Sequence, residues 1–209
     1  MTDAARQQSP AAQTIAYVIE DRLYLNITDR CTLACRFCPK TQGSRRVHDY
    51  DLTLDHRPEF DEVVAAIGDP TAHAEVVFCG YGEPTLRLGL LLEVARWVKQ
   101  RGGRVRVNTD GLASLANKRD VLPEMAGLVD ALSVSLNAQS PEVYNRHCEP
   151  ALPGAYQALL AFLQEAPRYV PEVTATAIDG LEDVDIEACA RIARMCGARF
   201  RRRELDVVG

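Results

Sequence analysis

The chain has 209 residues, and its 24 Lys and Arg against 29 Asp and Glu give a formal net charge of −5. Hydrophobic residues make up 47% and charged residues 25%, a globular balance that excludes a disordered chain, a fibrous repeat and a disulfide mini-protein. The mild acidity provides no global attraction for nucleic acid or an anionic membrane, which argues against a nucleic-acid partner without excluding one.

The first ten residues show no apolar stretch after a basic start, so no secretory signal is visible. No run approaches the roughly 18 uncharged apolar residues of a membrane helix. We therefore expect a cytoplasmic protein with no membrane contact. Residues 1–16 are expected to form a flexible tail, and residues 17–209 one domain.

Strand-like and helix-like segments alternate along the rest of the chain. The expected strands span residues 22–28, 75–80, 104–109, 131–137, 173–178 and 198–204. Apolar residues at helical spacing predict helices near residues 60–67 (with Pro58 in the first turn), 88–98, 115–125, 156–163 and 186–196. A small hairpin is expected over residues 17–25. Strand and helix in alternation predict a parallel sheet with right-handed crossovers.

Six such units are too few for an eightfold barrel of about 250 residues. The predicted strands also carry one apolar and one polar face, as Val105 and Val107 alternate with Arg106 and Asn108. A sheet covered by helices on both faces would be apolar on both. The sequence thus predicts an α/β fold, a (βα)6 partial TIM barrel with parallel strands, helices outside and a polar lumen. Solvated edge strands remain the alternative explanation.

Three of the seven cysteines lie within eight positions, as Cys31, Cys35 and Cys38 in a C-x3-C-x2-C spacing directly after the first strand. Three thiolates on one loop can hold three irons of a [4Fe–4S] cluster, whereas ferredoxin-type clusters take four cysteines and are closed. The fourth iron then has an open position for a substrate or cofactor. Structural zinc wants four ligands in paired spacings, and the nearest further candidates are Cys79 and His48.

These cysteines, with Phe37 before the last, resemble the signature of the radical S-adenosylmethionine (SAM) superfamily. Residues 80–84 (GYGEP) resemble its GGE motif, with Tyr81 in place of the middle glycine. Residues 107–111 (VNTDG) resemble its T-N-G turn, and residues 133–137 (SVSLN) its ribose-binding strand. Over residues 17–204 the pattern is most similar to the short TatD-linked radical SAM subfamily, including residues 38–40 and 49–55.

The resemblance implies one [4Fe–4S] cluster held by Cys31, Cys35 and Cys38, with SAM on the remaining iron. SAM is cleaved reductively to a 5′-deoxyadenosyl radical, which abstracts a hydrogen atom from an unknown substrate. The residues implied to bind SAM are Phe37 near the adenine, Gly80, Tyr81, Gly82 and Glu83 (backbone carbonyls and the Glu83 carboxylate) at the ammonium, and Asn108, Ser135 and Asn137 on the strands.

A reductant such as flavodoxin or ferredoxin is the partner that the resemblance implies, with a TatD-type nuclease as a further association. A glycyl-radical-activating enzyme is the first alternative. A non-catalytic iron–sulfur or zinc protein, for interaction or electron transfer, is the alternative from another class.

Several residues have weaker functional patterns. Cys189 and Cys196 share an apolar helix face and are expected to pack in the core. Cys79 could face either the lumen or the helices. Cys148 could reach the rim as a hydrogen donor or cluster ligand, or it could pack in the core or lie at the surface, and His48 and His147 are expected in surface loops. The arginines of the last strand protect a solvated edge, or bind an anionic group together with Arg106. These arginines are Arg199, Arg201, Arg202 and Arg203.

Overall fold

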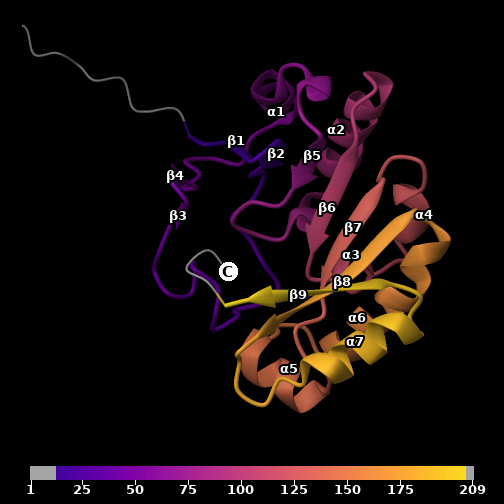
Figure 1. Cartoon of the computed structure of the whole chain (residues 1–209). Helices are drawn as coiled ribbons and strands as arrows, with labels where there is room; N and C mark the ends of the chain where they lie inside the picture. The colour runs from indigo at the N-terminus through magenta and orange to yellow at the C-terminus, as the bar shows by residue number, and fades with distance from the viewer. Residues whose placement is uncertain (1–12, 206–209) are drawn as a thin grey trace, which may run out of the picture.

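One seven-stranded sheet organises the computed structural model, which describes residues 13–205 (Figure 1). Its strand order is β1-β2-β5-β6-β7-β8-β9. The bounds are β1 Ala16–Ile19, β2 Arg22–Leu25, β5 Glu75–Phe78, β6 Val105–Thr109, β7 Ala131–Ser135, β8 Glu172–Asp179 and β9 Arg199–Glu204. Every pair from β2 onward is parallel, which confirms the six predicted strands.

Sequential strand order with parallel pairing is the topology of successive βα units. β1 and β9 are the two edges of this sheet, so the barrel is partial and not closed. The predicted hairpin is also present, because β1 pairs antiparallel with β2 around Glu20, whose φ is +57°. Its second strand is the first strand of the barrel itself.

The helices lie together on the outer side of the sheet (Figure 1). They are α1 Phe60–Ile67, α2 Leu88–Gln100, α3 Ala113–Asn117, α4 Leu122–Met125, α5 Pro141–Cys148, α6 Ala155–Glu165 and α7 Ile186–Met195. Three 3₁₀ turns join them, η1 Pro70–Ala72, η2 Pro84–Arg87 and η3 Ala166–Arg168. None of the described helices is long and apolar enough to cross a membrane.

The structure differs from the predicted helices at three places. The expected helix over residues 115–125 is two short ones, because Lys118 ends α3 in the left-handed region with φ +54°. Pro58 precedes the N-cap residue Glu59 and is not in the first turn of α1. α5 was expected to be a loop, and a separate two-stranded sheet, β3 (Arg46–Val47) with β4 (Tyr50–Asp51), was not expected.

The two faces of the main sheet divide as the alternation predicts. Outward side chains such as Leu25, Phe78, Val107 and Val134 have no exposed surface and form one core with the helices. The opposite face carries Tyr24, Arg106, Asn108, Ser133, Ser135 and Thr176, and the cysteine loop lies at the C-terminal ends of the strands. The predicted tail, residues 1–16, lies outside the described residues up to position 12.

Candidate functional site

The loops that follow β2, β5 and β6 meet at one end of the sheet. The loop after β2 carries the three cysteines, and the loop after β5 carries the GYGEP motif. The Glu83 backbone N–H donates to the carbonyl of Arg30 at 2.7 Å, and Arg30 directly precedes Cys31. A Cβ on Gly82 would lie 2.4 Å from the Arg30 carbonyl oxygen and 2.6 Å from that of Thr28. Glycine is therefore required at position 82 by the approach of the cysteine loop.

Gly80 is required by a second close approach, to the end of β2. Its φ is +75°, and a Cβ there would lie 2.7 Å from the Cα of Asn26. The buried Asn26 amide donates to the Leu52 carbonyl at 3.1 Å and accepts from the Tyr81 N–H at 3.3 Å. The Tyr81 ring, in place of the family's middle glycine, packs with Tyr17 and Leu52.

Glu83 joins the loop after β5 to the loop after β6. Its side chain is 4% exposed, and its carboxylate accepts from the Thr85 N–H at 3.0 Å and hydroxyl at 2.6 Å. It also accepts from the Thr109 hydroxyl at 2.9 Å and from the Asp110 N–H at 2.7 Å. With these donors on the carboxylate, the predicted contact with a ligand ammonium depends on the backbone carbonyls of this loop.

Asp110 completes a buried pair of acids, which sequence reasoning treated only as part of a turn. Its carboxylate accepts from the Thr32 hydroxyl at 2.6 Å, which ties the loop after β6 to the cysteine loop. Burial, followed by the charge of Asp110, raises the pKa of Glu83 to about 8. Burial also raises the pKa of Asp110. The sequence did contain a signal for this acid pair, because Asp110 stands where the T-N-G turn has asparagine.

The three cysteines lie close to one another, and Cys31 lies close to this acid pair. Cys31 is exposed, whereas Cys35 and Cys38 are half-buried. Partial desolvation of the Cys31 thiol and the charges of Asp110, Glu83 and Cys38 raise its pKa to about 12. A hydrogen bond with the Cys148 thiol, burial, and the charges of Cys148, Cys31 and Cys38 raise the pKa of Cys35. Metal ligation requires the thiolate, so the protons must leave as a metal centre binds.

The chemistry of the donor set fits an iron–sulfur cluster, because cysteine thiolates are its usual ligands. Among residues 13–205, no three His, Cys, Asp or Glu side chains are grouped as one metal ion would need. One zinc ion gathers its sulfur ligands at about 2.3 Å from a shared centre. A cubane cluster takes each thiolate on a different iron, so its cysteines stand further apart.

α5 holds the cysteine loop from the other side. The Ala34 N–H donates to the Cys148 carbonyl at 3.0 Å, and the Arg36 N–H to the His147 carbonyl at 2.9 Å. The Arg36 side chain pairs with Glu149 at 2.7 Å. His147 was expected at the surface in a loop, but it is 7% exposed and lies on α5, with Nε2 2.7 Å from the Glu182 carbonyl oxygen. Cys148 is fully buried against Cys35.

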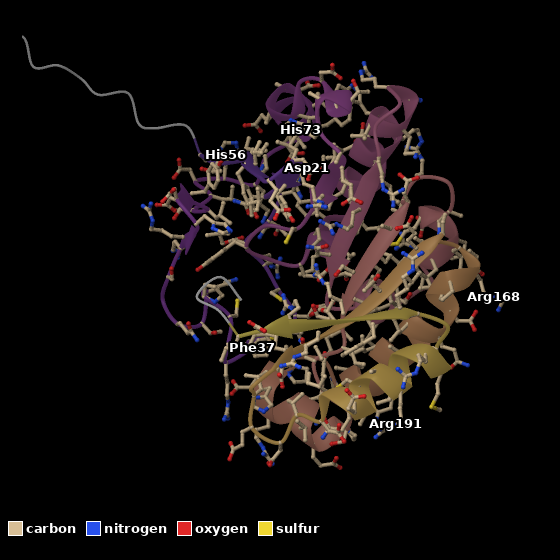
Figure 2. All side chains as sticks on the ribbon, viewed as in Figure 1. Asp21, Phe37, His56, His73, Arg168 and Arg191 are labelled. Atoms are coloured by element: carbon tan, nitrogen blue, oxygen red, sulfur yellow. The ribbon has the colours of Figure 1, made fainter. Side chains whose placement is uncertain are left out.

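The residues predicted to bind SAM also lie at this end of the sheet. Asn108 and Ser135 are on the inner face of β6 and β7, and Asn137 follows β7 with a φ of +59°. The Asn108 amide donates to the Cys79 sulfur at 3.5 Å, and the Asn137 amide to the Cys148 sulfur at 3.6 Å. Phe37 is half-buried on the cysteine loop, on the side toward which the strands point (Figure 2).

Four buried polar atoms of residues near the cysteines have no hydrogen-bond partner among the described residues. They are the amide oxygens of Asn108 and Asn137 and the hydroxyls of Tyr81 and Tyr144. An unpaired buried polar group is costly, so such atoms usually face a ligand or an ordered water. The amide oxygens are acceptors and fit the hydroxyls or the ammonium of SAM, and thus the residues present fit both cofactors.

The remaining candidates are placed as follows. Cys79 is on the inner face of the sheet, and Cys189 is fully buried while Cys196 is half-buried, both at α7. His48 is exposed at the turn between β3 and β4. Arg106 pairs with Glu75 at 3.2 Å, and its guanidinium donates to the Tyr24 hydroxyl. On the edge strand β9, Arg199 and Arg201 are exposed on the inner side, and Arg202 pairs with Asp179.

Comparison with known proteins gives consistent results. A family model of the radical SAM superfamily matches residues 25–196. A GTP 3′,8-cyclase of Limosilactobacillus fermentum is 34% identical over 128 residues, which is 60% of this chain and 36% of that protein. A GTP 3′,8-cyclase of Streptomyces coelicolor is 30% identical over 171 residues, 77% of this chain and 46% of that protein. The chain thus spans between a third and a half of these two relatives.

Two solved structures show the same fold. Streptococcus suis SuiB bound to S-adenosylmethionine has a TM-score of 0.66 at 11% identity, covering 88% of this chain and 40% of that chain. An archaeal TYW1 has a TM-score of 0.56 at 14% identity, covering 88% of this chain and 64% of that chain.

We predict that Gly82→Ala lowers the free energy of unfolding by about 1–3 kcal/mol and reduces iron uptake, because its Cβ pushes the cysteine loop away. Gly89→Ala is the matched control, since a Cβ there meets nothing within 4 Å. On α2 it should be neutral or stabilising by up to about 1 kcal/mol. Urea denaturation and iron analysis measure both effects. Equal stability and iron uptake in the two variants would contradict the close approach.

We predict that the free energy of unfolding falls as pH rises from about 4.5 to about 8. Glu83 keeps its proton in the folded chain up to about pH 8 but loses it near 4.5 when unfolded, so the folded state binds more protons in this window. One such group contributes at most about 1.4 kcal/mol per pH unit. Asp110→Asn removes the neighbouring charge and should flatten the decline. Denaturation curves across this range test it, and identical slopes in both proteins would disprove the shared burial of the two acids.

Proposed function

The chain belongs to the radical SAM superfamily, and we propose that Cys31, Cys35 and Cys38 hold its [4Fe–4S] cluster with one iron left open for SAM. The superfamily consists of enzymes that use this cluster and SAM. The proposal for these residues is supported by one observation above all. The three thiols lie close enough to interact with one another, and four buried polar atoms of residues near them have no hydrogen-bond partner within residues 13–205.

The residues around these thiols divide the binding of SAM among them. We assign the ammonium to the backbone carbonyls of residues 80–83, where Gly80 and Gly82 allow the loop to lie against β2 and the cysteine loop. The unpaired amide oxygens of Asn108 and Asn137, with the Ser135 hydroxyl, are the acceptors for the ribose hydroxyls. Phe37 packs beside the adenine.

When bound, the cluster and SAM together supply a 5′-deoxyadenosyl radical, which removes a hydrogen atom from the substrate. The role of the chain is to hold the reacting groups on the inner face of the sheet and to keep water away. The outer face is closed by the apolar core, so the substrate must approach from the inner face or from the open edges at β1 and β9.

GTP is the first substrate to test, because two of the relatives carry the name GTP 3′,8-cyclase. Arg201 is exposed on the inner side of β9 and offers a guanidinium to a phosphate or carboxylate. The association with a TatD-type nuclease and the reductant, flavodoxin or ferredoxin, remain predictions. Membership in the superfamily favours the enzyme over the zinc or electron-transfer alternative.

We predict that Cys35→Ala loses cluster assembly, because one of three anchoring thiolates is missing. Cys189→Ala is the control, since this cysteine is also buried but lies on α7 in the core. It should keep about four irons per chain and lose about 1 kcal/mol or more of stability. Iron and sulfide analysis after anaerobic reconstitution measures this. Equal iron loss in both variants would mean that the assigned ligands are wrong.

We predict that Asn137→Gly weakens SAM binding by roughly tenfold or more while the cluster spectrum persists, because one buried acceptor is lost. Glycine is chosen because position 137 has a positive φ that alanine would strain. Asn117→Ala is the control, since the Asn117 amide donates to the Thr85 and Ala113 carbonyls. Anaerobic equilibrium dialysis with SAM measures the affinity, and unchanged binding in Asn137→Gly would remove this residue from the site.

A further inference from the structure

Two side chains of α5, those of Tyr144 and Cys148, lie on the side of the cysteine loop. Tyr144 and Cys148 are four residues apart and therefore share one helix face. Both have no exposed surface. The Cys148 sulfur contacts the Cys35 thiol and accepts from the Asn137 amide. This face of α5 thus covers the side of the site where Cys35 lies.

The Tyr144 hydroxyl is buried and has no hydrogen-bond partner among residues 13–205. Burial, followed by the charges of Cys148, Asp110, Cys35 and Cys31, raises the pKa of this phenol. Tyr144 lies one helical turn before Cys148, whose sulfur contacts the Cys35 thiol, so its ring is on the face of α5 that is turned to the cysteine loop. A phenol hydroxyl can donate one hydrogen bond.

The position of the Tyr144 ring is fixed by its surroundings. The ring packs on the Tyr156 ring, with centroids 5.4 Å apart and planes at 50°. The Tyr144 backbone is held in α5, whose end is bonded to the cysteine loop at Ala34 and Arg36. Because the hydroxyl is buried at this fixed position, its donor needs an acceptor other than bulk water.

We propose that the Tyr144 hydroxyl donates a hydrogen bond to a sulfur atom of the cluster on the Cys31–Cys35 side. This inference rests on the proposed function. Tyr144 is then a positioning residue that tunes the cluster, since hydrogen bonds to the sulfurs help to set the reduction potential of iron–sulfur clusters. The bond stabilises the more negative, reduced cluster and therefore raises its potential.

Tyr144→Phe tests this through stability, with Tyr156→Phe as the matched control. In the cluster-free chain, the loss of an unpaired buried hydroxyl should raise the melting temperature by about 2–4 °C. In the reconstituted chain the same change removes a bond, so the gain should disappear or reverse. The Tyr156 hydroxyl donates to the Ala138 carbonyl at 3.3 Å, so Tyr156→Phe should lower both melting temperatures alike.

Potentiometric titration of the reconstituted proteins is the second readout. The potential should fall in Tyr144→Phe and stay unchanged in Tyr156→Phe, at equal iron content. An unchanged potential, with the same melting shift in the cluster-free and reconstituted Tyr144→Phe chains, would overturn the inference and leave the proposed function standing. Failure of the wild-type chain to take up iron would refute the proposed function itself.

Discussion

The site depends on one buried carboxylate, Glu83, which holds three strand-end loops together. Its side chain accepts hydrogen bonds from η2 and from the loop after β6, and its backbone N–H bonds to the cysteine loop. The Asp110 carboxylate in turn accepts a hydrogen bond from the Thr32 hydroxyl on the cysteine loop. Burial of the carboxyl group, and then the charge of Asp110, raise the pKa of Glu83. The hydrogen bonds of the two acids offset the free-energy cost of burying them, and they are needed because the loops after parallel strands are not held together by a ladder of backbone hydrogen bonds.

Around this junction, each residue type has a distinct structural role. Glycines at positions 80 and 82 let backbones approach one another, and the asparagines leave acceptors for a ligand. The cysteine loop has no regular structure and is held between the GYGEP loop and α5. Leu33, Cys35 and Phe37 of this loop also pack against the main core, so the cysteines are held on a fixed support. The unclosed sheet leaves the inner face accessible at its edges.

The parallel strands could be predicted because residues alternate between apolar and polar in strands such as β6, whereas β5 is a short apolar run between helical segments. The cysteine ligands could be proposed because their spacing lies within one short loop. α5 could not be predicted by periodicity, since Pro141–Cys148 is short and mixes polar with apolar residues. Its N-cap Ser140 followed by Pro141 was the signal that could have found it. The contacts of Tyr144, Cys148 and Asp110 depend on residues far apart in the chain, which a single sequence does not specify.

The central claim is that three thiolates anchor the cluster and leave one iron for SAM. The most direct measurement is electron paramagnetic resonance of the anaerobically reconstituted, dithionite-reduced chain with and without SAM. The account predicts that the signal of the reduced cluster changes when SAM is added, because SAM binds an iron that has no protein ligand. A fully assembled cluster whose signal is identical at saturating SAM would contradict it.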